Sequence, residues 1–544
     1  MLKKLLALLL AVIMVMSMVA CANDVPTGTK PNVNKPTSGN NDATGGEDAT
    51  GGEDAQPSET EAEPKDPVTI TFHYTQFVGE QQYTNDVEEK LNEIMQAIPG
   101  YELITLDIVP HGTGYATDIS LAQANGDQID ILNTFNLPFD KMVADGDFMI
   151  LDDLLAKYPG VASDVPEWLI DYGRYDGDLV YIPTYQQAQS PAFFYAPVEY
   201  FEYYYKESGK DDAYIRSVLN SGEPLKILEF CEEFYLAVVK GTGLKTKKMF
   251  GGWNNWHFYN KDDIAHDGSV GVTKKEGGKP VYYPLTDEFH DIYAKLNEWY
   301  KKGYTNDPTV KNSYNFKTDD NSVVFGIGTN AVSEEAYGKA MSNKDKGECK
   351  AIKVTDHCYI EGKWAAGGNA IYADCEHPEE AMMVIELLMS EKSVEFYNTL
   401  IWGLEGIHYK WIDKNVNRIE TLEFSGTQGG ADTTYCAWNW NTGNIFNGWL
   451  NQSSANDDHY KFIEDEIHNS PKTVTSPFIG FTWHLEDVDN ERSQCKAVNT
   501  EYFGSLYAAP NFEERYTEYV NKLKAAGVDK IMETINEQYA EAVK

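Results

Sequence analysis

The polypeptide opens its folded part with two kinds of hydrophobic pattern. From Val68 to Tyr74, large apolar side chains alternate with smaller or polar ones, which is the two-residue period of a β-strand. Apolar residues then recur at helical spacing from Val87 to Ile98. Pro99-Gly100 ends this helix, and a second strand is expected from Leu103 to Val109. The body therefore begins with a βαβ unit.

The alternation of helix and strand continues along the next stretch. We expect a helix around Thr117 to Ala124, a short buried strand at Asp130 to Asn133, and a broken helix from Met142 to Leu155. Asn85 followed by Glu88 predicts a capping box at the start of the first helix. Strands alternating with helices indicate a mainly parallel sheet of the α/β class.

Several residues follow the predicted strands directly. In open parallel sheets ligands bind outside the carboxyl ends of the strands. Tyr74, Gln76, Asn133 and Thr134 are therefore candidates for a binding crevice. The alternative is that these side chains only cap turns and loops.

Later segments carry clear helical patterns. Thr286 precedes an apolar stripe from Phe289 to Tyr300, which ends at Lys301-Lys302-Gly303. Pro378 marks the first turn of another helix. The chain closes on two amphipathic helices, within 516–523 and 531–539.

The amino-terminal residues have the features of an export signal. Two lysines precede an apolar run from Leu5 to Met16, and small residues lead to Cys21, so residues 1–20 are predicted to be a signal peptide. Met18-Val19-Ala20-Cys21 resembles the lipobox of bacterial lipoproteins, which implies lipid attachment at Cys21. The alternative is ordinary cleavage near Ala20.

Residues 21–66 have almost no large apolar side chains and repeat the hexapeptide Ala-Thr-Gly-Gly-Glu-Asp. Such a segment cannot bury enough apolar surface to fold, so we interpret it as a disordered acidic linker behind the lipid anchor.

The remaining length and the charge limit the function classes. The body from residue 67 is long enough to require two domains. A formal net charge of -40 argues against nucleic acid or an anionic membrane surface as partner. Six cysteines follow Cys21 without any Cys-x-x-Cys pair, so no metal site is predicted. Free thiols and one or two disulfide bridges both remain open.

Two short stretches interleave indoles with amides. One contains Trp253, Asn255 and Trp256, and the other contains Trp438 and Trp440. A sugar offers hydroxyls and an apolar ring face, which aromatic and amide side chains bind together. Both stretches are candidate ligand contacts, and the alternative is that they cover a sheet edge.

Several segments, taken in order, resemble the extracellular solute-binding proteins of bacterial ABC importers for carbohydrates. They read TDISLAQANGDQIDILNT, VADGDFMILDDLLAKYPG, YDGDLVYIPTY and HPEEAMMVIELLMSEKSVEFYNTLIWGLEGIHY. The tail, with CKAVNTEYFGSLYAA, resembles the C-terminal domain of unknown function found in one subgroup of these lipoproteins.

The resemblance implies a two-lobed, periplasmic-binding-protein-like type II fold with discontinuous lobes, hinge crossings and a ligand cleft between the lobes. We expect residues 67–184 plus 365–404 in lobe 1 and residues 185–364 plus 405–544 in lobe 2, with 478–544 as the family-specific segment. The crossings are expected near Pro183, Gly367 and Leu404. Trp402 and Glu405, in the last of these turns, are further candidate ligand contacts.

The function implied is capture of an extracellular solute, most simply a sugar or oligosaccharide, and its delivery to the membrane subunits of an ABC importer. The protein would be a monomer on the extracellular face of the cell membrane, held there only by its lipid, with no cofactor and no catalytic residues. The alternatives are a binding protein for a peptide or another non-sugar solute, a secreted glycan-active hydrolase, and a structural surface protein. No nucleophile elbow, phosphate-binding glycine loop or helical His pair points to an enzyme.

Overall fold

A computed structural model gives the arrangement of most of the chain beyond residue 65. It describes residues 66–76, 78–187, 190–244, 247–249, 261–263, 270–273, 279–310, 316, 322–354, 359–360, 367–422, 434–451, 459–476 and 478–542. The predicted signal peptide, Cys21, nearly all of the linker, and the stretch with Trp253, Asn255 and Trp256 lie outside these residues. Within the described residues, no helix is both long enough and apolar enough to cross a membrane.

The described residues form many short strands and a similar number of helices. The strands are β1 (Val68–Thr75), β2 (Ile104–His111), β3 (Ile131–Asn133), β4 (Arg174–Tyr175), β5 (Asp178–Leu179), β6 (Ile182–Pro183), β7 (Ala192–Pro197), β8 (Lys261–Asp263), β9 (Val270–Thr273), β10 (Pro280–Tyr282), β11 (Gly326–Thr329), β12 (Cys349–Lys353), β13 (Tyr359–Ile360), β14 (Gly368–Ile371), β15 (Tyr409–Asp413), β16 (Arg418–Thr421) and β17 (Val474–Thr475). The α-helices are α2 (Thr84–Gln96), α3 (Tyr115–Asn125), α4 (Phe139–Asp145), α5 (Asp152–Lys157), α6 (Glu167–Asp171), α7 (Val198–Ser208), α8 (Asp212–Leu219), α9 (Pro224–Thr242), α10 (Asp287–Lys301), α11 (Glu334–Met341), α12 (Pro378–Met389), α13 (Val394–Trp402), α14 (His459–Ile463), α15 (Asp489–Tyr502), α16 (Phe512–Ala525) and α17 (Val528–Ala542).

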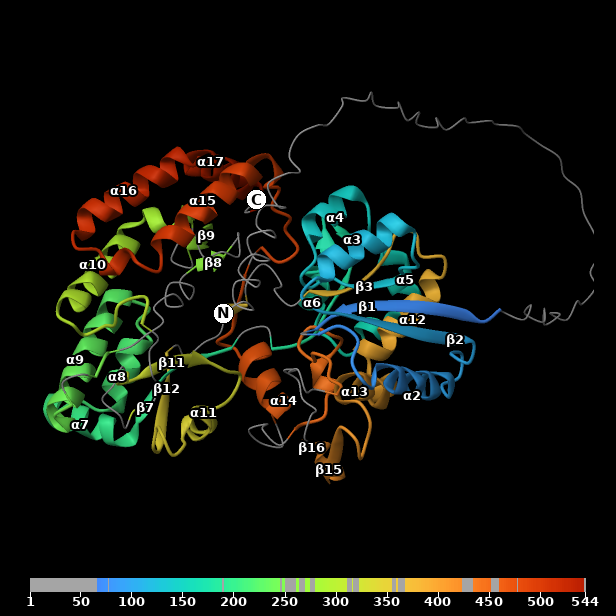
Figure 1. Cartoon of the computed structure of the whole chain (residues 1–544), viewed down its shortest axis with the longest axis horizontal. Coiled ribbons are helices and arrows are strands. Elements are labelled where there is room, and N and C mark those ends of the chain that lie inside the picture. The colour runs from blue at the N-terminus through green and yellow to red at the C-terminus, as the bar shows by residue number, and fades with distance from the viewer. Residues whose placement is uncertain are drawn as a thin grey trace, which may run out of the picture. The chain divides into compact units, whose positions relative to one another are not determined.

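The first lobe is built on a five-stranded sheet with the order β2-β1-β3-β14-β6. β1 pairs in parallel with β2 and β3, as the βα alternation predicts, whereas β14 runs antiparallel to both β3 and β6. Helices α2 and α12 bury their apolar faces against this sheet, and α13 packs against both helices (Figure 1). We call this set of buried side chains the first core.

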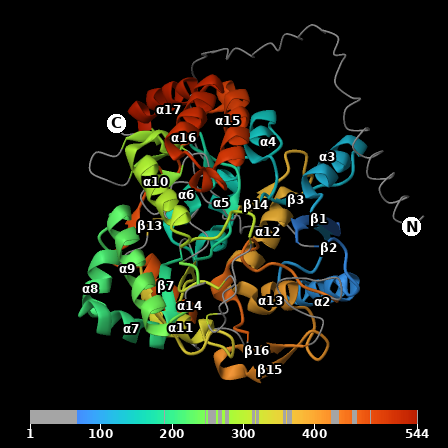
Figure 2. The ribbon, with the colours of Figure 1, turned by 60° about the vertical axis from the view of Figure 1, so that its left-hand side comes forward.

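The second lobe has a smaller antiparallel sheet with the order β11-β7-β12. Helices α7 and α9 pack together beside it, and α10 carries the apolar stripe that the sequence predicts, with the side chain of Thr286 accepting from the backbone N–H of Phe289. Helices α15, α16 and α17 lie beside α10 in two views (Figure 1, Figure 2). Their buried residues belong to the same cluster as α10, which we call the second core.

The chain passes between the two sheets at two predicted places and at one that was not predicted. It leaves the first sheet after β6 and returns to it at β14, close to Pro183 and Gly367. The predicted crossing near Leu404 is wrong, because Tyr409, Ile419 and Trp449 still pack in the first core. The third passage therefore lies between Trp449 and Phe478, where β17 pairs in parallel with β13.

Two other local expectations need correction. The capping box at Asn85 is wrong: Tyr83 occupies the N-cap of α2 without a side-chain cap. Glu88 instead accepts a hydrogen bond from the backbone N–H of Ile108, at 2.9 Å, and so ties the helix to β2. The sheets are also less parallel than predicted, since the whole second-lobe sheet is antiparallel.

The cysteines that the structure describes form no disulfide bonds. All of them are buried, namely Cys231, Cys349, Cys375, Cys436 and Cys495. Burial raises the pKa of the Cys375 thiol to about 12. These thiols therefore act as small apolar side chains in the two cores.

Candidate functional site

Residues 434–441 form a strap across the carboxyl ends of β1 and β3. The backbone N–H of Cys436 donates to the side-chain oxygen of Gln81 at 2.6 Å, and the N–H of Tyr83 donates to the carbonyl of Thr434 at 3.2 Å. Gln81 and Tyr83 lie in the loop that follows β1. The strap thus covers the sheet edge at which open α/β sheets bind ligands.

Asn133, the last residue of β3, holds the far end of the strap. Its side-chain amide donates to the carbonyl of Asn441 at 2.6 Å, and its side-chain oxygen accepts from the N–H of Phe135 at 3.2 Å. Asn133 is fully buried. A buried amide that makes several hydrogen bonds is costly to replace, so Asn133 is a positioning residue for the strap rather than a surface contact.

Three aromatic side chains meet beside Asn133. The ring centroid of Phe135 lies 4.6 Å from that of Trp440 and 6.3 Å from that of Trp438, both edge-to-face, and the two indoles are 5.3 Å apart. Trp438 is 8% exposed, while Phe135 and Trp440 are half-buried. We call Phe135, Trp438 and Trp440 the aromatic corner. Its half-buried rings are the type of surface on which a sugar ring stacks.

A histidine pair lies at the same edge of the sheet. His73 Nδ1 is 3.0 Å from His111 Nε2, and His111 Nδ1 is 3.1 Å from a carboxylate oxygen of Asp118. Burial, together with the neighbouring His111, lowers the pKa of His73 to about 4. His73 is therefore neutral at pH 7 and can donate from Nε2 to the carbonyl of Gln128.

The structure brings together only some of the predicted contacts. Asn133, Trp438 and Trp440 meet, but they lie on the first lobe, so the assignment of the Trp438 stretch to the second lobe is wrong. Phe135 was missed, although its position just after β3 was a usable signal. The predicted contacts Trp253, Asn255 and Trp256 lie outside the described residues.

Four other candidates lie away from the aromatic corner or inside the core. Tyr74 is fully buried and stacks on Phe72 with centroids 5.2 Å apart. Gln76 is buried and donates to the carbonyl of Gly79 at 3.1 Å. Trp402 ends α13 within the first core, and Glu405 is exposed in the turn that follows. Their role in ligand binding stays a prediction.

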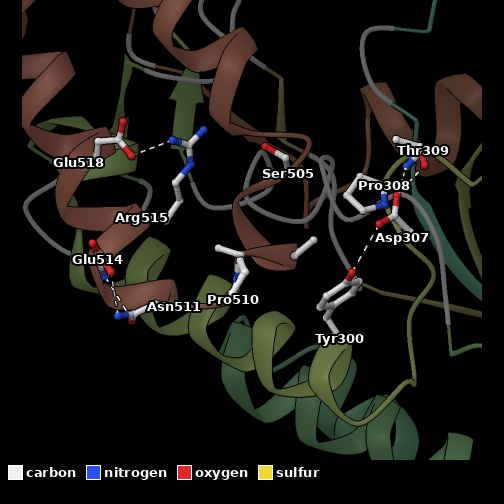
Figure 3. Close-up of a pocket in the computed structure, with 12 residues that line it drawn as sticks. Tyr300, Asp307, Pro308, Thr309, Ser505, Pro510, Asn511, Glu514, Arg515 and Glu518 are labelled. Carbon is white, nitrogen blue, oxygen red and sulfur yellow. Dashed lines mark hydrogen bonds and ion pairs between the residues drawn. The ribbon is translucent and has the colours of Figure 1, made fainter.

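A cavity of about 560 Å³ lies in the second lobe, between the end of α10 and the segment from Ser505 to Glu518 (Figure 3). Its charged groups are already paired, since Arg515 donates to Glu518 at 2.7 Å and Asp307 accepts from the N–H of Thr309 at 2.9 Å. Tyr300 supplies one aromatic wall. This cavity is therefore a weaker candidate for the ligand site than the aromatic corner.

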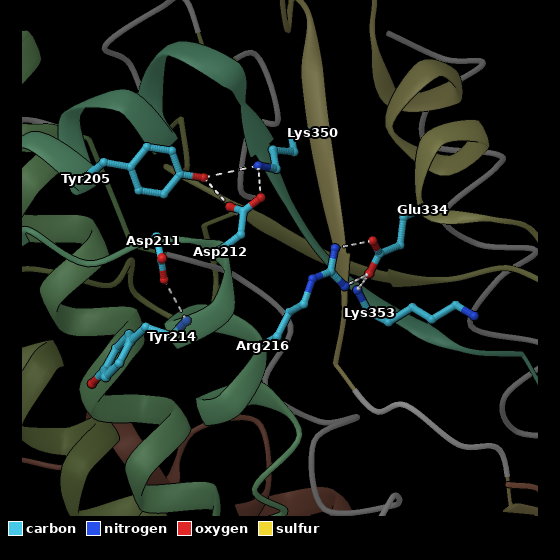
Figure 4. Close-up of polar contacts among 8 residues, drawn as sticks. All are labelled: Tyr205, Asp211, Asp212, Tyr214, Arg216, Glu334, Lys350 and Lys353. Atoms are coloured by element: carbon cyan, nitrogen blue, oxygen red, sulfur yellow. Dashed lines mark hydrogen bonds and ion pairs between the residues drawn. The ribbon is translucent and has the colours of Figure 1, made fainter.

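A network of charged groups ties α8 to α11 and β12 in the second lobe (Figure 4). Arg216 donates from two nitrogens to the carboxylate of Glu334, which also accepts from the N–H of Lys353 at 2.7 Å. Although burial opposes it, these bonds lower the pKa of the Glu334 carboxyl. Every carboxylate in this network has a protein partner, so we interpret it as structural. Across the described residues, no group of three His, Cys, Asp or Glu is placed to hold a metal ion.

Comparison with known proteins bears on the tail and on the fold. Residues 477–544 match the family model described as "Domain of unknown function (DUF3502)", which confirms the predicted C-terminal segment. No curated protein matches the sequence. A solved structure of the N-glycan transport solute binding protein NgtS from Streptococcus pneumoniae superposes with a TM-score of 0.64 at 17% identity, covering 88% of this chain and 99% of that one.

This chain has the fold of an ABC-importer solute-binding protein. NgtS in complex with Man1GlcNAc also superposes, with a TM-score of 0.57 at 17% identity over 87% of this chain and 99% of that one. An extracellular solute-binding protein from Bifidobacterium longum subsp. infantis gives a TM-score of 0.54 at 12% identity over 88% and 99%. The two-lobed α/β fold predicted from the sequence is thus confirmed, and these similar structures are binding proteins rather than enzymes.

Proposed function

We propose that this protein is the substrate-binding component of an ABC importer and captures an extracellular sugar or oligosaccharide. The observation that carries the proposal is the aromatic corner, which lies at the carboxyl edge of the first-lobe sheet in a two-lobed binding-protein fold. Similar structures include a protein solved with Man1GlcNAc and one solved with kestose, which supports a carbohydrate ligand.

The chemistry of the corner suits a sugar better than a charged solute. Sugar ring faces stack on indoles, and their hydroxyls need amide or carboxylate partners, which carbonyls and amides of the strap can supply. A peptide or another solute is the alternative ligand, and hydrolysis of a glycan is the alternative activity. In our proposal the ligand leaves unchanged, and contacts from both lobes favour one arrangement of the lobes, which the importer's membrane subunits recognise.

Trp440→Ala is expected to weaken glycan binding strongly. Loss of a half-buried indole at the centre of a contact should cost about 2 kcal/mol, or roughly thirty-fold in Kd. The ligand is found first by thermal shift of the wild type with N-glycan fragments and fructo-oligosaccharides, since binding to the native state raises the melting temperature. Kd is then measured by calorimetry with the best glycan.

The matched control is Tyr300→Ala, which removes the aromatic wall of the other cavity. It is expected to leave Kd unchanged. If Tyr300→Ala weakened binding and Trp440→Ala did not, the ligand site would lie in the second-lobe cavity. If no carbohydrate raised the melting temperature, the sugar-binding proposal would fail, and chromatography showing cleaved glycan would replace it with a hydrolase.

The location proposed is the extracellular face of the cell membrane, through a lipid on Cys21 and an acidic linker of residues 21–66. Cys21→Ala is expected to release the protein from washed membranes into the medium, because the lipid is the only predicted attachment. Cys21→Ser serves as the near-isosteric comparison and should behave in the same way. Retention of both variants on the membrane would exclude the anchor, and sedimentation would test the proposed monomer.

A further inference from the structure

A two-residue hairpin on the first lobe presents its turn to the C-terminal domain. β4 and β5 are joined by Asp176 and Gly177, whose φ angles of 52° and 94° suit a tight hairpin turn. The hairpin is fixed to the first lobe on its other side. Leu179 is fully buried in the first core, and Arg174 pairs with Asp152 at 2.8 Å.

The turn makes polar contacts with residues 482–486. The backbone N–H of Asp176 donates to the hydroxyl of Thr482 at 2.9 Å, and a carboxylate oxygen of Asp176 lies 3.0 Å from His484 Nε2. Tyr175 donates to the carboxylate of Glu486 at 3.4 Å and meets the ring of His484 edge-to-face. Residues more than 300 positions apart in the sequence are thereby joined.

Residues 482–486 belong firmly to the second lobe. Phe478, which precedes this segment, and Leu485, which lies within it, are buried in the second core. The backbone N–H of His484 donates to the side-chain oxygen of Gln538 at 2.8 Å, and the Gln538 amide donates back to the carbonyl of His484. Helix α17 therefore fixes the backbone that carries the His484 ring.

We propose that this contact is a latch by which the DUF3502 domain controls the angle between the two lobes. The latch consists of Asp176 on the first lobe with Thr482 and His484 on the second, and along the chain it follows the third passage by a few residues. This proposal rests on the movement of the lobes that the proposed function requires. When the lobes rotate about their connections, the rigid hairpin and the rigid segment separate and the latch opens.

The strength of the contact suits a reversible latch. The side chains of His484 and Asp176 are 49% and 57% exposed, so water replaces the lost partner when the latch opens. An exposed polar contact of this kind changes an equilibrium about two- to five-fold, and the bond to Thr482 adds a similar factor. Such factors bias an equilibrium between lobe arrangements without locking it.

The test measures the distance between the lobes in the full chain without any ligand. Spin labels are attached to unnatural amino acids at Glu89 of α2 and Lys524 of α16, both of which are exposed, so that native thiols are not involved. The distance distribution is compared between the wild type and the double variant Asp176→Asn with Thr482→Val. Asparagine tolerates the positive φ angle, so the turn is kept. We expect the fraction of molecules whose label-to-label distance lies outside the main wild-type peak to rise about five-fold or more.

The control is Asp178→Asn, which makes the same charge change on the same hairpin at an exposed position. It should reproduce the wild-type distribution, and all variants should keep the wild-type melting temperature. If the distance distribution of the double variant overlays that of the wild type, the latch proposal is overturned and the proposed function is unaffected. If the distance distribution changes in the double variant but the protein binds no carbohydrate, the latch stands and the proposed ligand is rejected.

Discussion

Gly368→Ala is expected to lower the stability of the first lobe by about 3 kcal/mol, the upper part of the range for overpacking a core. A β-carbon at this position of β14 would lie 2.1 Å from the carbonyl oxygen of Ile182 and 2.7 Å from the α-carbon of Pro183. These are backbone atoms of the neighbouring strand β6, and Thr134 holds Gly368 from the other side through two hydrogen bonds of 2.8 and 2.9 Å. Neither neighbour can move aside as the end of a flexible side chain would.

The measurement is the denaturant midpoint, followed by hydrogen exchange of β3, β6 and β14 to locate the change, since the lobes can unfold separately. The control is Gly504→Ala, because a β-carbon there meets nothing within 4 Å. Its stability should stay level or rise slightly, as expected when alanine restricts the unfolded chain. If Gly368→Ala were as stable as the control, β6 and β14 would be packed less closely than these distances indicate.

The sequence predicts the local elements well because their signals are local. The alternation in Val68–Tyr74 and the apolar stripe of α10 each arise from neighbours within one element, and both elements appear where expected. The order of motifs also suffices to identify the fold and the C-terminal segment. Hydrophobic periodicity does not show in which direction a strand runs. The antiparallel pairing of β14 with β3 and β6 was therefore not predicted.

The candidate site could be predicted only in part, because it is assembled from distant segments. Asn133 and the Trp438 stretch were each recognisable, but the hydrogen bond that joins Asn133 to Asn441 spans 308 positions and has no sequence signal. The same limitation explains the lobe error. Tyr409 and Trp449 are apolar residues that could fill either core, and only tertiary packing places them in the first. Tyr74 follows the right strand, but its side chain points into the core.

Acidification from pH 7 to pH 5 is expected to destabilise the protein through three buried histidines. Burial lowers the pKa of His73, His408 and His468 to about 4, from an ordinary value of 6.5, with repulsion from His111 adding to the effect at His73. Between these two values the unfolded chain binds a proton at each position and the folded chain does not, so stability falls as the pH falls through this window. Each histidine should contribute roughly 2 kcal/mol of loss at pH 5.

Two of these histidines can be replaced by asparagine with one hydrogen bond of each kept. His408 Nδ1 accepts from the N–H of Leu404 at 2.9 Å, and His468 Nδ1 lies 2.8 Å from the hydroxyl oxygen of Tyr185. An asparagine Oδ1 can take a similar position, so His408→Asn and His468→Asn remove the titration and keep an acceptor for this bond. Each should reduce the fall in melting temperature between pH 7 and pH 5 by roughly 4 °C or more, if the lobes unfold as units of ordinary size.

His290 supplies the control with the opposite sign. Although burial opposes it, hydrogen bonds to Asp291 and Glu513 raise the pKa of this partly exposed side chain, so its contribution is present at low pH and is lost as the pH rises. His290→Asn should therefore leave the acid-induced fall as steep as in the wild type or make it steeper. If all three substitutions reduced the fall in melting temperature equally, the histidines would act through net charge. If only His408→Asn and His468→Asn reduced it, the cause would be the burial of a neutral imidazole. That outcome would place part of the acid sensitivity in the first lobe, where His408 lies against Tyr83 at the edge that carries the aromatic corner.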